Sequence, residues 1–254
     1  MLNIFTRVQD DKREKYDTSF LNEEVAREVH DYHMSFPMYE ETPFRCLKNL
    51  AEKAGVKNIL VKDESYRFGL NAFKVLGGSF AIGKVIAEKL DMDIKDLTFE
   101  KLKSQEVKDK LGDVTFITAT DGNHGRGLAW AANQLNQKSI VYMPRGSAEE
   151  RVKNIEKEGA TVKVLDLNYD ECVREANKLA EEKGYIMVQD TAWDGYEDIP
   201  KWIMQGYMTL AWEMYESLQE KNIKPSHVSC KQVLGPLQQR QQDFLQICIG
   251  KTSR

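Results

Sequence analysis

The sequence predicts an α/β protein built around a parallel β-sheet. Its middle part alternates short β-branched runs with segments of helical spacing, and short links join them. Such alternation is typical of βαβ units, in which successive strands run parallel. The chain has 254 residues, 41% of them hydrophobic, which is enough for one large domain or two small ones.

The elements of this sheet follow one another in order along the chain. Four strands are expected, at Val114–Ala119, Ser139–Met143, Thr161–Leu165 and Tyr185–Gln189. Three helices are expected between them, at Leu128–Leu135, Ala148–Glu158 and Tyr169–Lys183. Gly159 and Gly184 follow the last two helices, where a glycine C-cap is common.

The flanking regions are expected to lie outside this sheet. A strand is predicted at Asn58–Lys62 and a helix starting near Asn71, while residues 88–112 resemble a connecting helical segment. Asp198–Gln219 is predicted as one helix rich in Trp, Met and Tyr. Its tryptophans are expected to belong to the core.

Composition and charge exclude several classes of function. The net charge of −4 gives no reason to expect nucleic acid or an anionic membrane as a partner. No apolar run approaches membrane-spanning length, and the segment after Met1 lacks a signal-peptide core. The four cysteines are scattered without metal-ligand or redox spacing, so free thiols in a reducing cytoplasm and no metal site are expected.

Two segments carry the chemistry. Asn71–Ser79 reads NAFKVLGGS and places Lys74 among apolar and glycine neighbours, where a solvated surface lysine is unusual. An enclosed lysine can form a Schiff base with an aldehyde. Thr120–Gly127 reads TDGNHGRG, a glycine-rich turn between strand and helix whose backbone can approach a flat, charged cofactor. Together they indicate pyridoxal phosphate (PLP) as the cofactor.

The glycine-rich turn offers several candidate groups at the carboxyl end of a strand, where ligands bind in parallel sheets. Asp121 is a candidate general base and Asn123 a candidate partner of a cofactor hydroxyl, although both residues also suit a helix cap and turn. The spacing of Gly122 and the following glycines does not match the dinucleotide fingerprint. His124 lacks a second metal ligand nearby and is expected to be structural or to pack against the cofactor.

A further acid follows the last predicted strand. Asp190 lies in the segment Gln189–Tyr196, which reads QDTAWDGY. An acid at the carboxyl end of a parallel strand is well placed for a site, but a helix cap or a solvated turn explains it equally well.

Three separated segments resemble the diaminopropionate ammonia-lyases, which belong to the fold-type-II PLP enzymes. They read YRFGLNAFKVLGGS at Tyr66–Ser79, ATDGNHGRG at Ala119–Gly127 and QDTAWDGY at Gln189–Tyr196. The resemblance extends over nearly all of residues 1–228. It implies a PLP-dependent α,β-elimination that converts D- and L-2,3-diaminopropionate to pyruvate and two ammonia molecules.

The resemblance also implies roles for individual residues. Lys74 carries the Schiff base, and Lys74 and Asp121 match the pair that removes the α-proton from opposite faces. Asp190 matches a second active-site acid, and Asn123 the amide that faces the PLP ring hydroxyl. Gly122 and His124 are expected to lie against the cofactor.

The same resemblance suggests a division of the chain. Residues 1–87 would form the first part of a large domain that carries Lys74, and residues 88–222 a connecting helix and a small βαβ domain. Residues 223–254 would begin the second part of the large domain. Intact family members are homodimers, and dimerisation of this chain is doubtful.

The segment after Val228 departs from the family. Family members continue with a strand and a glycine loop, roughly FLQAGVGSF, whose amides hold the PLP phosphate, whereas this chain continues SCKQVLGPLQQRQQDF. Reading its codons one base out of phase, with permitted synonymous codons, gives FLQAGVGSFAAAAAGF. We therefore expect residues 229–254 to be out-of-frame translation, the alternative being a genuine divergent tail.

Three functions remain open from the sequence. The first is a diaminopropionate lyase by descent whose present chain is weakly active or inactive. The second is another fold-type-II lyase such as a threonine or serine deaminase, which usually carries serine in place of Asp121. The third is a remnant without function.

Overall fold

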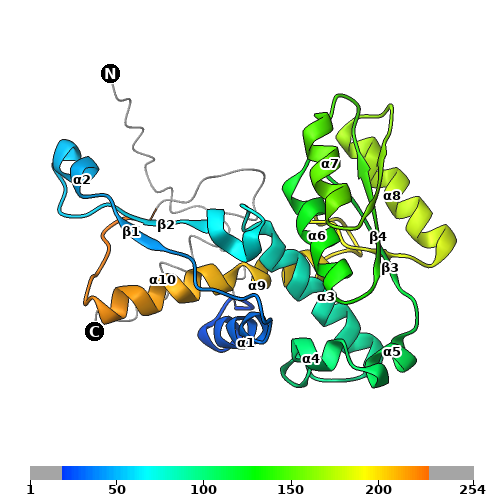
Figure 1. The fold of residues 1–254 in the computed structure, drawn as a ribbon, viewed down its shortest axis with the longest axis horizontal. Helices are drawn as coiled ribbons and strands as arrows, with labels where there is room; N and C mark the ends of the chain where they lie inside the picture. Colours follow the sequence, from blue (N-terminus) through cyan, green and yellow to red (C-terminus); the bar gives the residue numbers. More distant parts are fainter. Residues whose placement is uncertain (1–18, 229–254) are drawn as a thin grey trace.

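The computed structural model describes residues 19–228, and all structural statements below refer to these residues. A parallel sheet and its helices form one side of the molecule, and a helical part with a β-hairpin forms the other (Figure 1). The long helix α3, Lys74–Leu90, runs between the two sides (Figure 1).

The predicted parallel sheet is confirmed. It contains four strands in the order β5-β4-β3-β6, and every neighbouring pair is parallel. The strands are β3 (Thr115–Ala119), β4 (Lys138–Met143), β5 (Thr161–Val164) and β6 (Ile186–Met187). The last strand is shorter than predicted because its ladder with β3 contains only two residue pairs.

Helices cover both faces of this sheet (Figure 1). They are α6 (Asn123–Gln134), α7 (Glu149–Lys157) and α8 (Tyr169–Lys183). Ile117 and Ala119 pack with Cys172 of α8, whereas Val141 and Met143 of β4 pack with α6 and α7 on the opposite face. The alternation of side chains along the strands thus buries both faces.

The ends of α8 follow the prediction. Asn168 and Glu171 form a reciprocal capping box at its start. Gly184 ends it with φ 68°, a left-handed conformation that glycine adopts without a Cβ clash. In contrast, the cap of α7 is Glu158, and Gly159 follows it with φ 95°.

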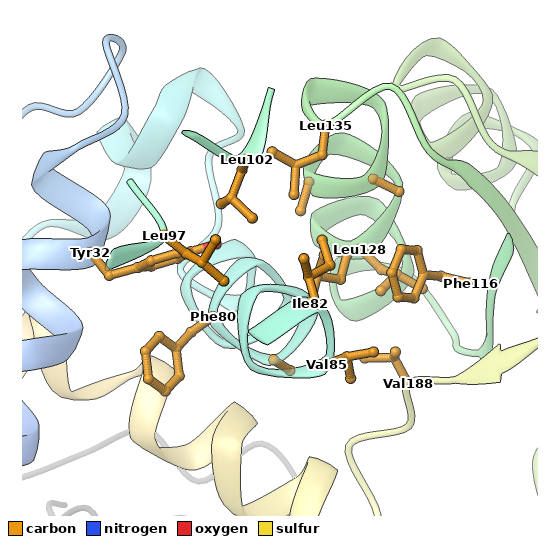
Figure 2. Close-up of a cluster of buried hydrophobic side chains, with 14 of the residues drawn as sticks. Tyr32, Phe80, Ile82, Val85, Leu97, Leu102, Phe116, Leu128, Leu135 and Val188 are labelled. Atoms are coloured by element: carbon orange, nitrogen blue, oxygen red, sulfur yellow. The ribbon is translucent and has the colours of Figure 1, made fainter. Parts of the chain in front are cut away.

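Helix α3 forms the centre of the hydrophobic core, and most of its residues are buried. Figure 2 shows Phe80, Ile82 and Val85 of α3 pointing in different directions around the helix. They meet side chains from α6, from β3 and from α1, among them Leu128, Phe116 and Tyr32 (Figure 2). A helix that is apolar around its circumference is stable only when it is buried on all sides.

The other side of the molecule is built from three helices and a hairpin. The helices are α1 (Glu23–Met34), α9 (Asp198–Gly206) and α10 (Met208–Glu220). The hairpin pairs β1 (Phe44–Cys46) antiparallel with β2 (Leu60–Lys62), with α2 (Lys48–Ala54) between them. The predicted strand at Asn58–Lys62 is therefore present, but its partner β1 and the helix α1 were not predicted.

The single helix predicted at Asp198–Gln219 was wrong. The helix is interrupted at Tyr207, so that α9 and α10 follow one another as separate helices. At the break, α9 lies so close to α3 that a Cβ on Gly206 would be 2.5 Å from the Leu76 carbonyl oxygen. Close packing against α3 therefore sets the direction of α9 at this point.

The connecting segment is helical, as predicted. It consists of η2 (Ile94–Asp96), α4 (Phe99–Leu102) and α5 (Gln105–Leu111). The proposed domain boundary after residue 87 falls within the last turn of α3, so the division into domains stays a proposal. Within the described residues, no helix combines the length and apolar character needed to cross a membrane.

Candidate active site

Lys74 is the first residue of α3. The predicted start near Asn71 was three residues early, because Asn71 has φ 55° and cannot belong to a right-handed helix. The preceding turn η1 (Glu64–Gly69) ends in two further residues with positive φ, Phe68 at 47° and Gly69 at 71°. This irregular turn determines the position from which Lys74 enters α3.

Lys74 is paired with Asp190. Its Nζ donates a hydrogen bond of 2.8 Å to Asp190 Oδ2, and the two side chains are 18% and 16% exposed. The residues lie 116 positions apart in the sequence. The fold therefore joins two candidates that the sequence predicted separately.

A close contact between α3 and α6 brings the glycine-rich turn to this pair. A Cβ on Gly127 would lie 2.7 Å from Val75 Cα, so only glycine allows this separation of the two helices. Gly127 belongs to the predicted turn segment, and Val75 follows Lys74. The beginning of α6 consequently lies beside the beginning of α3.

Asp190 follows β6, and its surroundings favour the ionised carboxylate. Burial alone would raise its pKa, but the charge of the Lys74 ammonium and the 2.8 Å hydrogen bond that it donates to Oδ2 favour the carboxylate, and the pKa lies below its usual value. Asp190 thus carries a negative charge beside the lysine amine at neutral pH.

His124 is fully enclosed in α6. Its Nε2 lies 2.8 Å from the Val188 carbonyl oxygen, which can only accept, so Nε2 carries the proton. Burial lowers the pKa of the ring, which is then neutral, and Nδ1 is an acceptor 4.0 Å from Asp190 Oδ2. Within residues 19–228, Nδ1 is the single buried side-chain polar atom that has no hydrogen-bond partner.

Asp121 and Asn123 are exposed at the start of α6. The N-cap of this helix is Gly122, so the alternative that Asp121 caps the helix is not observed. The Asp121 carbonyl accepts a 2.9 Å bond from Arg151 Nη1, and Gly122 N–H donates to Thr120 Oγ1 over 3.0 Å. In the described part of the chain, the side chains of Asp121 and Asn123 make no hydrogen bond to Lys74 or Asp190.

Sequence reasoning missed three polar groups near this pair. Gln189, Tyr169 and Tyr196 surround the end of β6 and are linked by hydrogen bonds. Burial is the largest cause that raises the pKa of Tyr169, and together with the negative charge of Asp190 it brings the pKa to about 12. Gln189 and Tyr196 belong to a segment singled out for Asp190 alone, whereas Tyr169 begins α8 without a local signal.

A fourth residue, Arg126, was quoted within the glycine-rich segment without a role. Its Nη1 donates a 2.8 Å bond to the Leu70 carbonyl in the turn before Lys74. Its Nε and Nη2 both bind Glu158, just after α7. Arg126 therefore connects α6 and the end of α7 with the turn that leads into α3.

Comparison with known proteins shows what this arrangement is similar to. The chain matches the pyridoxal-phosphate dependent enzyme family over residues 36–231. It is 53% identical over 222 residues to the diaminopropionate ammonia-lyase of Salmonella typhimurium. This alignment covers 85% of this chain and 55% of that relative. The biosynthetic L-threonine dehydratase of the same organism is more distant, with 28% identity over 60% of this chain and 26% of that relative.

A solved structure agrees with the sequence relatives. Escherichia coli diaminopropionate ammonia lyase in complex with D-serine matches with a TM-score of 0.78 and 50% identity, over 82% of this chain and 52% of that chain. The chain thus spans about half the length of the ammonia-lyases that it matches. Since the family match over residues 36–231 includes both glycine-rich segments and the loop after β6 that carries Asp190, this protein belongs to the pyridoxal-phosphate dependent enzymes, and its cofactor is pyridoxal phosphate.

Proposed function

We propose that this chain descends from, and carries the lysine site of, a lyase that removes ammonia from 2,3-diaminopropionate by α,β-elimination, giving pyruvate and two ammonia molecules. The observation that carries the proposal is the Lys74–Asp190 pair, with Nζ and Oδ2 2.8 Å apart at the carboxyl edge of the parallel sheet. The 53% identity to an ammonia-lyase supports the substrate class.

The residues around this pair fit the cofactor. PLP, when bound, supplies the electron sink that lets an amino acid lose its α-proton. Lys74 provides the amine that would hold the cofactor aldehyde, and the unpaired Nδ1 of His124 offers a buried acceptor to a bound donor. Gly122 and Asn123, at the N-terminus of α6, would lie along the cofactor, with the Asn123 amide toward its ring hydroxyl.

The side chains of this chain would divide the proton transfers between them. The Lys74 amine, once released from the cofactor, would take the α-proton from one face and the exposed Asp121 carboxylate from the other. Asp190, ionised beside Lys74, would hold the β-ammonium that leaves. An amino acid with a second, cationic amino group suits a site that offers two carboxylates.

A threonine or serine deaminase is the alternative. Its relatives usually carry serine where this chain has Asp121, and the threonine dehydratase matched here is only 28% identical. We therefore place this activity second.

Two measurements test the proposal. Both use a chain whose reading frame after Val228 is restored by one added base. Incubation with saturating PLP followed by borohydride should fix the cofactor on Lys74 in peptide maps, and label on Lys62 or Lys84 instead would reject Lys74 as the residue that binds the cofactor. Pyruvate release from D- and L-diaminopropionate should exceed release from threonine, and the reverse order would favour the deaminase.

Location and assembly complete the proposal. We place the protein in the cytoplasm, acting on a small amino acid, with neither nucleic acid nor membrane as partner. The intact enzyme would be a homodimer. Size-exclusion chromatography with light scattering measures whether the 254-residue chain also forms one.

A further inference from the structure

Gln189 uses its whole side-chain amide in hydrogen bonds. The side chain is fully buried between β3, β6 and α8. Its Oε1 accepts from Thr118 Oγ1 at 2.8 Å and from Ala119 N–H at 3.1 Å. Its Nε2 donates to Tyr169 Oη at 2.9 Å and to Asp190 Oδ1 at 3.4 Å. The amide is therefore satisfied at both ends.

These partners determine which way the amide points. The Ala119 backbone N–H can only donate, so the atom of Gln189 that faces β3 must be the oxygen. The NH₂ group consequently faces Tyr169 and Asp190. A rotated amide would place two donors against Ala119 and leave Asp190 Oδ1 facing an oxygen.

The backbone around Gln189 is held as firmly as its side chain. Gln189 N–H donates to Tyr196 Oη at 2.7 Å, and that hydroxyl donates to the Met187 carbonyl at 2.9 Å. The Tyr196 ring stacks on Trp193, with centroids 4.1 Å apart. Val188 bonds through its N–H to Ile117 of β3 and through its carbonyl to His124.

The two oxygens of Asp190 thus have separate partners. Oδ1 lies next to the Gln189 amide, and Oδ2 faces the Lys74 ammonium at 2.8 Å. We propose that Gln189 is a positioning residue. Its amide nitrogen donates to Asp190 Oδ1, which leaves Oδ2 facing Lys74, and its amide oxygen links this carboxylate to the end of β3. The inference rests on the proposed roles of Lys74 and Asp190.

The same amide couples the two acids of the proposed reaction. Ala119, which Gln189 binds, lies two residues before Asp121, and Asp190 follows Gln189 directly. A shift of either loop would therefore change the other through one side chain. An apolar residue of equal size would fill the space but would leave the Ala119 N–H and Asp190 Oδ1 without this partner.

Two substitutions test the role in opposite directions. Gln189→Glu keeps the shape and the acceptor for Ala119 but adds a negative charge beside Asp190, which should stabilise the Lys74 ammonium. Gln189→Met removes the donor to Oδ1 and should weaken the ion pair between Asp190 Oδ2 and the Lys74 ammonium. Gln137→Glu is the matched control, because Gln137 accepts a 2.8 Å bond from Val114 N–H at the opposite end of β3.

The measurement is the pH dependence of Lys74 acetylation by trace acetic anhydride in the 254-residue chain, read by mass spectrometry against the exposed Lys163. We expect the pH midpoint to rise by about half a unit or more in Gln189→Glu and to fall in Gln189→Met, with no change in Gln137→Glu. A residue that served only stability would lower the melting temperature in both variants without moving the midpoints in opposite directions.

Each outcome bears on the proposal. Unchanged midpoints in the folded variants, or shifts of the same sign, would overturn it, as would failure of both variants to fold. If only one variant folds, a midpoint shift in the direction expected for that variant supports the proposal, and no shift or the opposite shift overturns it. PLP labelling with borohydride is run in parallel on the chain whose reading frame after Val228 is restored: opposite midpoint shifts without label on Lys74 in that chain would retain the positioning role and reject the proposed function.

Discussion

Asp121 and Asp190 follow neighbouring strands of one sheet but lie in different surroundings. Asp190 is mostly enclosed and paired with Lys74. In contrast, Asp121 is exposed, and its side chain makes no hydrogen bond to Lys74 or Asp190. An exposed carboxylate can approach a bound amino acid from the solvent side. The two acids therefore suit different steps of the proposed reaction.

Asp121→Asn should discriminate between the substrate isomers. In a catalytically competent preparation, turnover of D-diaminopropionate should fall by about 100-fold or more, since loss of a general base costs on that order. The L-isomer should be affected far less, because Lys74 still serves the opposite face. Initial rates of pyruvate release from each isomer measure this.

The control for this substitution is Asp194→Asn, which removes another exposed acid from the loop after β6. It should leave the ratio of the two rates unchanged. Equal losses for both isomers in Asp121→Asn would mean that Asp121 acts on the cofactor or on folding.

A buried ionic cluster holds the turn before Lys74. Arg67, fully buried, binds the buried Glu213 of α10 through two hydrogen bonds of 2.7 and 2.9 Å. Lys62 Nζ lies 2.5 Å from the same carboxylate. Burial alone would raise the pKa of Glu213, but the hydrogen bonds and charges of Arg67 and Lys62 lower it to about 2.

Glu213→Gln should lower stability in a pH-dependent way. Breaking such a buried pair costs roughly 3–5 kcal/mol at neutral pH. Because the pKa is depressed in the folded state, the benefit is complete above the ordinary carboxyl pKa of about 4.3 and is lost as the pH falls toward 2. Denaturant unfolding at several pH values measures the difference between the two proteins.

Glu216→Gln, an exposed position on the same helix, is the matched control and should change stability by less than about 0.5 kcal/mol. A difference between Glu213→Gln and the unmodified chain that stays constant from pH 7 to pH 3 would contradict the ionic account.

At the level of elements, α3 and α6 are joined by a contact that tolerates no added atom. Gly127→Ala would place a Cβ 2.7 Å from the Val75 backbone and should destabilise the chain by about 1–3 kcal/mol, the usual cost of overpacking. It should also weaken PLP labelling of Lys74, because α6 would move away from the start of α3. Thermal unfolding and labelling yield measure both effects.

Gln134→Ala, near the end of the same helix, is the control and should leave both quantities unchanged. If Gly127→Ala were as stable as the control variant, the close contact would not be a constraint on this fold.

Local sequence was sufficient for the sheet but not for its surroundings. The strands and helices from Val114 to Lys183 carry their own signals, in β-branched runs, helical spacing and Gly184. At the break before Tyr207, Gly206 packs against the backbone of α3, a partner distant in sequence, and the glycine alone does not indicate that contact. The same limit explains why β1 and α1 were missed.

The candidate site divides in the same way. Lys74 and Asp190 could be singled out because each lies in an unusual local context, a lysine among glycines and an acid after a strand. Their 2.8 Å pairing could not, since it joins residues 116 positions apart. The role of Gln189 depends on four partners, two in β3, one in α8 and Asp190 beside it in the chain, so it becomes visible only in the folded chain.

At the level of the whole molecule, the chain spans about half the length of its ammonia-lyase relatives. The predicted out-of-frame segment, residues 229–254, lies outside the described residues. On the reading-frame hypothesis, residues 229–254 replace the loop expected to hold the phosphate, and we therefore expect the 254-residue chain to bind PLP weakly and to be inactive or nearly so.

Comparison with a variant carrying one extra base after the Val228 codon tests this expectation, with pyruvate release measured at saturating PLP and diaminopropionate. Equal turnover by both chains would overturn the reading-frame hypothesis. Resequencing the coding DNA at this position tests the same hypothesis without protein.

The docking of α1 onto α10 has a consequence for synthesis on the ribosome. His33 Nδ1 shares a 2.6 Å hydrogen bond with Thr209 Oγ1, 176 residues later, and Leu21 and Ala26 pack against Met208 and Trp212. At about 5–20 residues per second, the part of α1 that packs on α10 would remain uncovered for roughly 10–35 seconds until its partner is translated. During that interval these apolar side chains would be exposed to solvent on the nascent chain, whereas the sheet could already assemble once β6 has emerged.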